Sequence, residues 1–396
     1  MKKLGVCLLL FSLCSAAFAQ RKKHHKSKPE TGPQINYALN RIFCGEIDAF
    51  YQKLQLLEKT KKGILTVVQL GDSHTQPDFI SSVVRDAFQQ RFGNAGRGMV
   101  FPYQLAKSNA PLDIVSSSTS AWEFNRLTHP EIDTNSGLSG FVLESAAKEG
   151  NFTVGLKDKA NGTQCFNSVR LFLKKSSATR CRIYSGLDTF DYQQQPITFS
   201  APVSSFGLNF SDNDSSFQFY GASLQNGQSG VLYHNIGVNG ARYDHYNLTE
   251  NFWQQLPALH ADLIIVSLGT NEAQRELFEP AAFDSILHIS IAKIKAAAPQ
   301  ASILITTAAD SYKGEGSNKT LKILNSYLEQ YCQKNQLALW DLYKVTNGYG
   351  SAKKWFKKGM MSKDRIHFVL PGYQLQGVLL LDCLMKGYEK FNARHP

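Results

Sequence analysis

The chain has 396 residues, which is more than one ordinary domain needs and about right for two. Hydrophobic residues make up 43% of it and charged residues 19%, a composition that excludes disordered and fibrous proteins and allows a large buried core. The formal net charge is +11, but five positive charges lie in the run at residues 21–28. The folded body is therefore only mildly basic, and we expect no nucleic-acid partner.

The N-terminus has the pattern of a secretory signal peptide at residues 1–19. Two lysines precede the apolar stretch 4–13, and Ala17-Phe18-Ala19 forms an A-x-A cleavage site. The apolar stretch is too short to span a bilayer, and no other segment has 18 uninterrupted apolar residues. Residues 20–35 are polar and basic and are typical of a linker. We therefore predict an exported protein, periplasmic or secreted, without an integral membrane segment.

Residues 36–96 have the pattern of the first part of an α/β domain. Apolar residues at helical spacing predict a helix over 36–59. The continuous apolar run 64–70 predicts a buried parallel strand. A second helix is expected over 77–92, with its proline near the first turn.

Residues 97–230 differ in character, because serine, threonine, asparagine, glycine and aromatic residues dominate. Turn signals separate short alternating runs, which predict an antiparallel β-sandwich inserted into the α/β domain. The runs lie at 152–156, 169–173, 182–184, 197–199 and 217–220. Cys165 and Cys181 are close enough in sequence to bridge a hairpin there, and two buried free thiols are an equal alternative.

The α/β pattern resumes over residues 231–396. Strands are expected at 231–238, 263–268, 303–307 and 338–342, and helices at 246–259, 281–298, 320–335 and 372–389. Strands that alternate with helices predict a parallel, doubly wound sheet. Such a sheet binds its ligands at the carboxyl ends of the strands.

Two short segments together supply the three parts of a serine nucleophile system. Ser73 follows the strand at 64–70, where its hydroxyl is exposed, and Asp364 precedes His367 by three residues. The imidazole of His367 is a candidate base, and Asp364 can hold it in one tautomer. Asp72 is assigned a structural role in the turn, because adjacent side chains diverge. Each segment alone is more often an ordinary turn or helix start.

Acyl transfer also needs hydrogen-bond donors for the developing oxyanion. Gly240 follows the strand at 231–238 and lets the chain turn so that a backbone N–H points into a cleft. Asn271 follows the strand at 263–268 and can donate through its side-chain amide. Each is unremarkable alone, but four such segments in one order are improbable by chance.

The segments G-D-S-H, N-x-G-x-N-G-A, G-T-N-E and D-x-x-H-F resemble, in this order, the four blocks of the SGNH (GDSL-like) esterases. The resemblance covers residues 64–96 and 231–385 and implies a flavodoxin-like three-layer parallel sheet. It also implies roles for the candidate residues. The nucleophile would be Ser73, the base His367 and the orienting group Asp364, with oxyanion donors from Ser73, Gly240 and Asn271.

We expect neither a metal nor a cofactor. His74, His234 and His245 lack metal-ligand spacing, and a serine triad needs no metal. His74 is expected either to line the cleft or to pack against neighbouring side chains.

The G-D-S-H form, the G-T-N-E-A segment and the sandwich between the first two blocks are similar to bacterial peptidoglycan O-acetylesterases, whose inserted domain resembles a carbohydrate-binding module. This implies an exported serine esterase that removes O-acetyl groups from a polysaccharide of the cell envelope. Peptidoglycan is the substrate that the resemblance favours. Alternatives are hydrolysis of another glycan or lipid ester, acyl transfer, and non-catalytic glycan binding. The aromatic residues of the insertion are expected to stack on sugars or to fill its core: Phe101, Tyr103, Trp122, Phe152 and Tyr184. The oligomeric state stays open.

Overall fold

The computed structural model describes residues 32–129, 135–145, 147–158, 164–193, 195–211 and 217–396. The chain divides into two units, residues 1–33 and 34–396. The predicted signal peptide and most of the predicted linker lie outside the described residues. None of the described helices has both the length and the apolar character that a membrane span requires.

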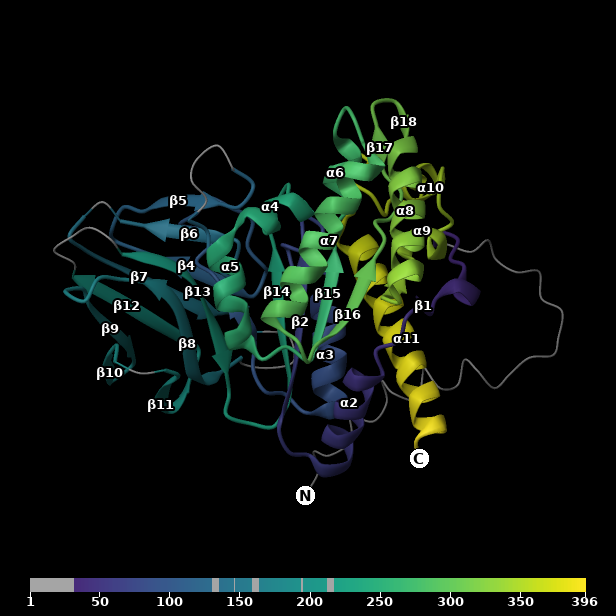
Figure 1. Cartoon of the computed structure of the whole chain (residues 1–396). Helices are drawn as coiled ribbons and strands as arrows, with labels where there is room; N and C mark the ends of the chain where they lie inside the picture. Colours follow the sequence, from purple (N-terminus) through teal and green to yellow (C-terminus); the bar gives the residue numbers. More distant parts are fainter. Residues whose placement is uncertain (1–31, 130–134, 146, 159–163, 194, 212–216) are drawn as a thin grey trace, which may run out of the picture. The chain divides into compact units, whose positions relative to one another are not determined.

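A six-stranded sheet forms the centre of the α/β part, in the order β1-β19-β16-β15-β2-β14 (Figure 1). Neighbouring strands from β19 to β14 are parallel, and β1 pairs antiparallel with β19 at the edge. The bounds are β1 Ile42–Cys44, β19 Ala338–Trp340, β16 Ser302–Thr306, β15 Leu263–Ser267, β2 Ile64–Gly71 and β14 Gly230–Gly237. The central strands are buried on both sides, as their continuous apolar runs predicted.

Helices cover both faces of this sheet, so the predicted three-layer SGNH-type fold is confirmed. Along β15, Leu263 and Ile265 pack into one core, and Ile264 and Val266 pack into the other. The first core contains residues of α2 Asp48–Thr60, α3 Ser81–Phe92, α9 Leu342–Val345, α10 Ser351–Lys357 and α11 Leu370–Arg394. The second contains residues of α4 Tyr243–Leu248, α5 Glu250–Gln255, α7 Pro280–Ala297 and α8 Lys319–Asn335.

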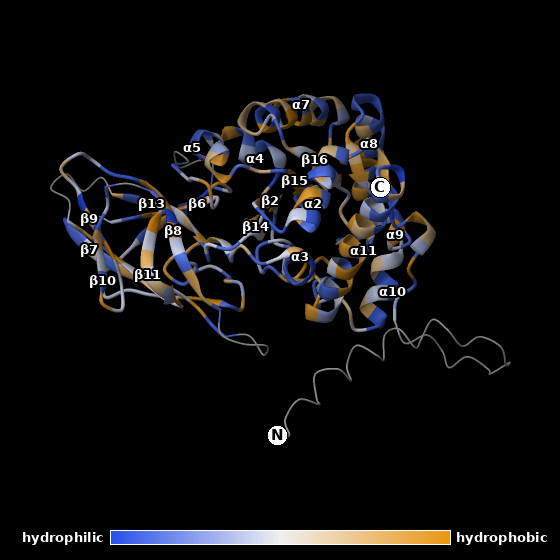
Figure 2. Ribbon diagram, turned by 90° about the horizontal axis from the view of Figure 1, so that it is seen from below, coloured by the Kyte–Doolittle hydropathy of each residue, from blue (hydrophilic) through white to orange (hydrophobic). Residues whose placement is uncertain are grey.

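Between α3 and β14 the chain forms two antiparallel sheets, in the orders β10-β9-β12-β7-β4 and β11-β8-β13-β6-β5, with β3 paired to β13. The bounds are β3 Gly98–Val100, β4 Ile114–Ser117, β5 Glu123–Arg126, β6 Phe141–Glu144, β7 Glu149–Leu156, β8 Phe166–Lys174, β9 Arg180–Ser185, β10 Asp188–Asp191, β11 Ile197–Val203, β12 Ser205–Ser211 and β13 Gln218–Gln225. Rings from the two sheets meet between them, for example Phe152 and Phe219 with centroids 4.7 Å apart. These strands form the predicted β-sandwich, and their alternation of polar and apolar residues is visible in Figure 2.

The structure decides two questions that the sequence left open in the sandwich. Phe101, Tyr103 and Phe152 are buried core residues, so a sugar-stacking role for these three is wrong. Cys165 is an exposed free thiol, so both the bridge from Cys165 to Cys181 and the alternative of two buried free thiols are wrong.

The helix predicted over residues 36–59 is wrong in its first half. α2 begins at Asp48, and Ile42–Cys44 form the edge strand β1. Cys44 has a φ of 68°, which no helix accommodates. The apolar residues that suggested a helix instead extend the sheet by pairing with β19.

Two other helices also differ from their predicted bounds. The helix predicted over 77–92 begins at Ser81, because Asp78 has a φ of 65°. The helix predicted over 246–259 is divided at Thr249 into α4 and α5, and it ends in the 3₁₀ turn Leu256–Leu259.

Candidate active site

The register of the central sheet brings three candidate segments to one edge. Gly71 at the end of β2 pairs with Gly237 of β14 on one side and with Ser267 of β15 on the other. Ser73, Gly240 and Asn271 follow these ends by two to four residues. The carboxyl ends of parallel strands meet at one sheet edge, so the three segments gather there.

The loop after β2 folds back tightly onto the strand ends. A Cβ atom on Gly71 would overlap Thr75, and one on Gly237 would overlap the backbone of Gln76. Only glycine fits at these two places, where backbone segments approach closely. Ser73, Gly240, Asn271 and His367 all line one cleft of about 660 Å³.

Ser73, His367 and Asp364 form a continuous hydrogen-bonded chain. The Oγ atom of Ser73 lies 2.8 Å from Nε2 of His367, and Nδ1 of His367 lies 2.7 Å from Oδ2 of Asp364. With the proton on Nδ1, the ring donates to the carboxylate and Nε2 accepts from the serine hydroxyl. This is the arrangement in which an imidazole can remove the serine proton.

Asp364 is held as a charged acceptor. Its Oδ1 atom accepts hydrogen bonds from Ser362 Oγ at 2.7 Å, Ile366 N at 2.9 Å and His367 N at 3.0 Å. Partial burial raises the pKa of Asp364, but the hydrogen bonds from His367, Ile366 and Ser362 outweigh it and hold the pKa well below its usual range. The carboxylate is therefore ionised at neutral pH and fixes the orientation of the imidazole.

Arg365 holds the loop between the aspartate and the histidine, and sequence reasoning missed it. Its guanidinium carbon lies 4.9 Å from the ring centroid of Tyr312 and 4.8 Å from that of Phe356. Its carbonyl accepts a hydrogen bond of 2.9 Å from Tyr312 N, and its φ of 55° is left-handed. The motif contains no signal for this contact, because both rings come from other parts of the chain.

Asp72 fixes the turn at the nucleophile, as expected from the sequence. Its side chain is 1% exposed, and Oδ1 accepts a hydrogen bond of 2.9 Å from His74 N. Burial raises the pKa of Asp72 to about 7. The Oδ2 atom faces Asn271, whose Nδ2 lies 3.3 Å away.

The two candidate oxyanion donors lie on either side of Ser73 in the cleft. Gly240 has a φ of 81°, a conformation that glycine adopts without cost. Asn271 lies in the first turn of α6 Thr270–Gln274, and its Nδ2 donates to Ala241 O at 3.0 Å. That bond holds the amide plane, and the long contact to Asp72 leaves the second N–H available to a better acceptor.

His74 lies against the imidazole of His367, with ring centroids 5.1 Å apart and an interplanar angle of 27°. Its Nδ1 lies 3.1 Å from the hydroxyl of Tyr373. Burial, and next the nearby His367, lower the pKa of His74 to about 3. His74 is therefore neutral and packs beside the candidate base without competing for the proton. Within the described residues, no group of three or more His, Cys, Asp or Glu side chains is arranged to hold a metal.

Comparisons with known proteins bear on the family and the fold. Residues 199–375 match the sequence model of the GDSL-like lipase/acylhydrolase family. A solved structure of a peptidoglycan O-acetylesterase is similar, with 21% identity and a TM-score of 0.74 over 88% of this chain and 99% of that one. A search of curated proteins found no match.

Other similar structures cover less of the chain. A lipase/acylhydrolase from Enterococcus faecalis is 20% identical over 39% of this chain and 75% of that one, with a TM-score of 0.30. The acetylxylan esterase Axe2 from Geobacillus stearothermophilus is 13% identical over 40% and 73%, with a TM-score of 0.31. By the family match and the fold, this chain carries a GDSL-like acylhydrolase domain of SGNH type and is an esterase.

Proposed function

We propose that this acylhydrolase is an exported serine esterase that removes O-acetyl groups from peptidoglycan. The hydrogen-bonded chain from Ser73 through His367 to Asp364 carries the proposal, because it is the arrangement that activates a serine hydroxyl. The similarity to a peptidoglycan O-acetylesterase supports the substrate, since it extends over nearly all of that protein. The signal-peptide pattern at residues 1–19 supports export.

In the first half of the reaction, Ser73 Oγ attacks the acetyl carbonyl carbon while His367 Nε2 takes the serine proton. The carbonyl oxygen becomes an oxyanion, which accepts hydrogen bonds from the N–H groups of Ser73 and Gly240 and from Asn271 Nδ2. The bond to the sugar oxygen then breaks, and His367 gives its proton to that oxygen. The products are a free sugar hydroxyl and an acetyl ester on Ser73.

In the second half, His367 takes a proton from water as the water oxygen attacks the acetyl-enzyme. The same donors hold the second oxyanion, and Ser73 leaves with the proton from His367. Asp364 stays ionised and stabilises the imidazolium in both halves, because the hydrogen bonds to its carboxylate keep its pKa low.

Acetate release from purified peptidoglycan tests the proposal. The protein should release acetate from O-acetylated peptidoglycan and none from the same material after chemical de-acetylation. A Ser73→Ala variant serves as the control for bound contaminants. Release from acetylated xylan but not from peptidoglycan would assign another glycan, and release from neither would contradict a glycan acetate as the substrate.

A further inference from the structure

The side chain of Gln76 is fully buried and joins three segments at the edge of the cleft. Its Nε2 atom donates to Ser108 Oγ at 2.9 Å and to Asn109 O at 2.7 Å. Its Oε1 atom accepts from Asn239 N at 2.7 Å. One amide therefore ties the loop after Ser73 to the segment between β3 and β4 and to the loop before Gly240, with both N–H groups and the carbonyl satisfied.

A buried ion network fixes residues 97–113, which include β3 and the segment between β3 and β4, at both ends. The Nη2 atom of Arg97 donates to Asp78 Oδ2 at 2.7 Å, and its Nε donates to Asp113 Oδ2 at 2.6 Å. Asp78 and Arg97 are 3% and 5% exposed. Paired buried charges of this kind are costly to separate, so residues 97–113 have one position relative to the loop that carries Ser73.

These contacts fix the backbones of two asparagines that line the cleft. Asn109 and Asn239 both line it together with Ser73. Gln76 holds each by its backbone, and neither side chain has a hydrogen-bond partner among the described residues. The amides of two residues that line the cleft of Ser73 therefore have donors and acceptors available to a ligand.

We propose that Asn109 and Asn239 form a saccharide subsite that binds hydroxyl and acetamido groups of the sugar carrying the ester. The inference rests on the proposed function and adds the residues that recognise the sugar. Among the described residues, only His367 and Tyr373 of the cleft lining are ionisable, so the cleft suits a neutral part of a glycan. An amide offers both a donor and an acceptor, which matches these groups. Contacts away from the ester orient it over Ser73 and contribute to the rate.

The test compares two substrates, O-acetylated peptidoglycan and p-nitrophenyl acetate, which lacks a sugar. The readout is the ratio of kcat/KM on the glycan to kcat/KM on the small ester. Asn109→Ala and Asn239→Ala should each lower this ratio about three- to tenfold, the effect of one lost hydrogen bond between neutral groups. The ratio cancels any general loss of folded enzyme.

Asn335→Ala is the matched control, because Asn335 lies at the C-terminal end of α8, outside the active-site cleft, and its amide donates to Tyr331 O of the same helix. Its ratio should equal that of the wild type. Gln76→Glu keeps the oxygen that accepts from Asn239 N but removes the N–H group that donates to Asn109 O. It should therefore lower the ratio. In the Asn109→Ala background the same change should lower the ratio little further. Circular dichroism of each variant checks the fold.

The outcomes separate the subsite from the proposed function. Wild-type ratios in both Asn109→Ala and Asn239→Ala, or an equal fall in Asn335→Ala, would overturn the subsite while leaving the esterase intact. If wild-type protein cleaves acetylated xylan but not peptidoglycan, the proposed substrate fails and the ratios on xylan decide the subsite. Cleavage of the small ester alone would overturn both.

Discussion

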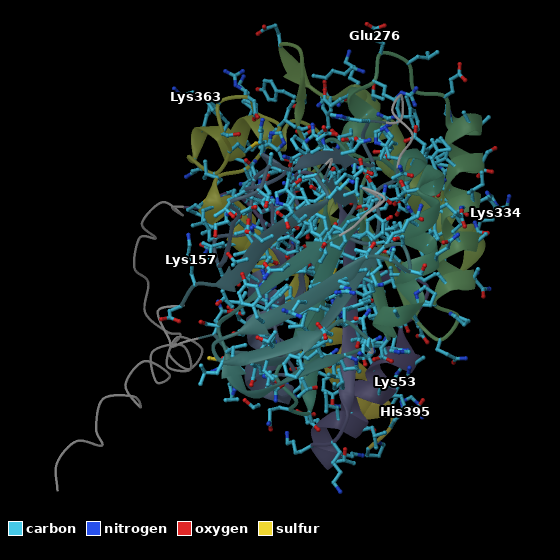
Figure 3. All side chains as sticks on the ribbon, turned by 90° about the vertical axis from the view of Figure 1, so that its left-hand side faces the viewer. Lys53, Lys157, Glu276, Lys334, Lys363 and His395 are labelled. Atoms are coloured by element: carbon cyan, nitrogen blue, oxygen red, sulfur yellow. The ribbon has the colours of Figure 1, made fainter. Side chains whose placement is uncertain are left out.

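The loop that carries Ser73 is buried, whereas the loop that carries Asp364 and His367 lies at the surface. Asp72 and Gln76, on either side of the nucleophile, are 1% and 0% exposed. The side chains of His367 and Asp364 are 39% and 47% exposed. Lys363, next to Asp364, projects outward (Figure 3).

Different forces therefore position the two halves of the proposed triad. The nucleophile loop is fixed by close backbone packing and by buried hydrogen bonds of Asp72 and Gln76. The base loop is fixed by its own hydrogen bonds to Asp364 and by the two rings around Arg365. Changes in the first loop should affect stability as well as rate, and changes in the second should affect mainly rate.

The largest effect should come from breaking the contact between the two loops. Ser73→Ala and His367→Ala should each lower kcat by about 10⁴–10⁶, and the double variant should be little worse, because the pair acts as a unit. Steady-state acetate release from O-acetylated peptidoglycan measures this. Losses that multiply in the double variant would show that the two side chains act independently.

Asn271→Ala should lower kcat by roughly 10²–10³ with little change in KM, because the amide acts mainly on the oxyanion of the transition state. The Ala241 carbonyl and Asp72 also lose a donor, so a thermal melt must accompany the kinetics. A kcat equal to that of the wild type would remove Asn271 from the site.

Arg365 tests the base loop alone. Arg365→Asn tolerates the φ of 55° and removes the ring contacts while keeping a Cβ atom, so kcat should fall about three- to tenfold. Arg365→Lys keeps a cation and should recover part of the loss. Lys363→Ala, in the same loop but exposed, is the control and should match the wild type. An equal loss in Lys363→Ala would contradict a specific role for the rings.

The burial of Asp72 in the nucleophile loop should make the free energy of unfolding depend on pH. The pKa of Asp72 is raised to about 7, so the folded state binds a proton that the unfolded state releases near pH 4. Asp72 therefore lowers the free energy of unfolding as pH rises from about 4 to about 7. Urea unfolding of the wild type and of Asp72→Asn is measured at pH 5 and at pH 8. From pH 5 to pH 8, the free energy of unfolding should fall more for the wild type than for Asp72→Asn. A constant difference between the two proteins would contradict the raised pKa.

The central strands and the four motif segments could be predicted because each signal is local. β2 is mainly apolar and buried from its second residue onward, and Ser73 lies two residues after its end. β1 could not be predicted, since its three residues become a strand only by pairing with β19, about 300 positions away. The roles of Gln76 and Arg365 could not be predicted for the same reason. Gln76 acts through contacts with Asn109 and Asn239. Arg365 acts through contacts with Tyr312 and Phe356.

A covalent label tests the central claim that Ser73 is the nucleophile activated by His367. Protein treated with phenylmethanesulfonyl fluoride is digested, the labelled peptide is located by mass spectrometry, and the remaining acetate release from O-acetylated peptidoglycan is measured. We expect one label at Ser73, activity that falls in proportion to the labelled fraction, and little labelling of the His367→Ala variant. Full activity in labelled protein, or a label elsewhere that abolishes activity while Ser73 is unmodified, would contradict the account.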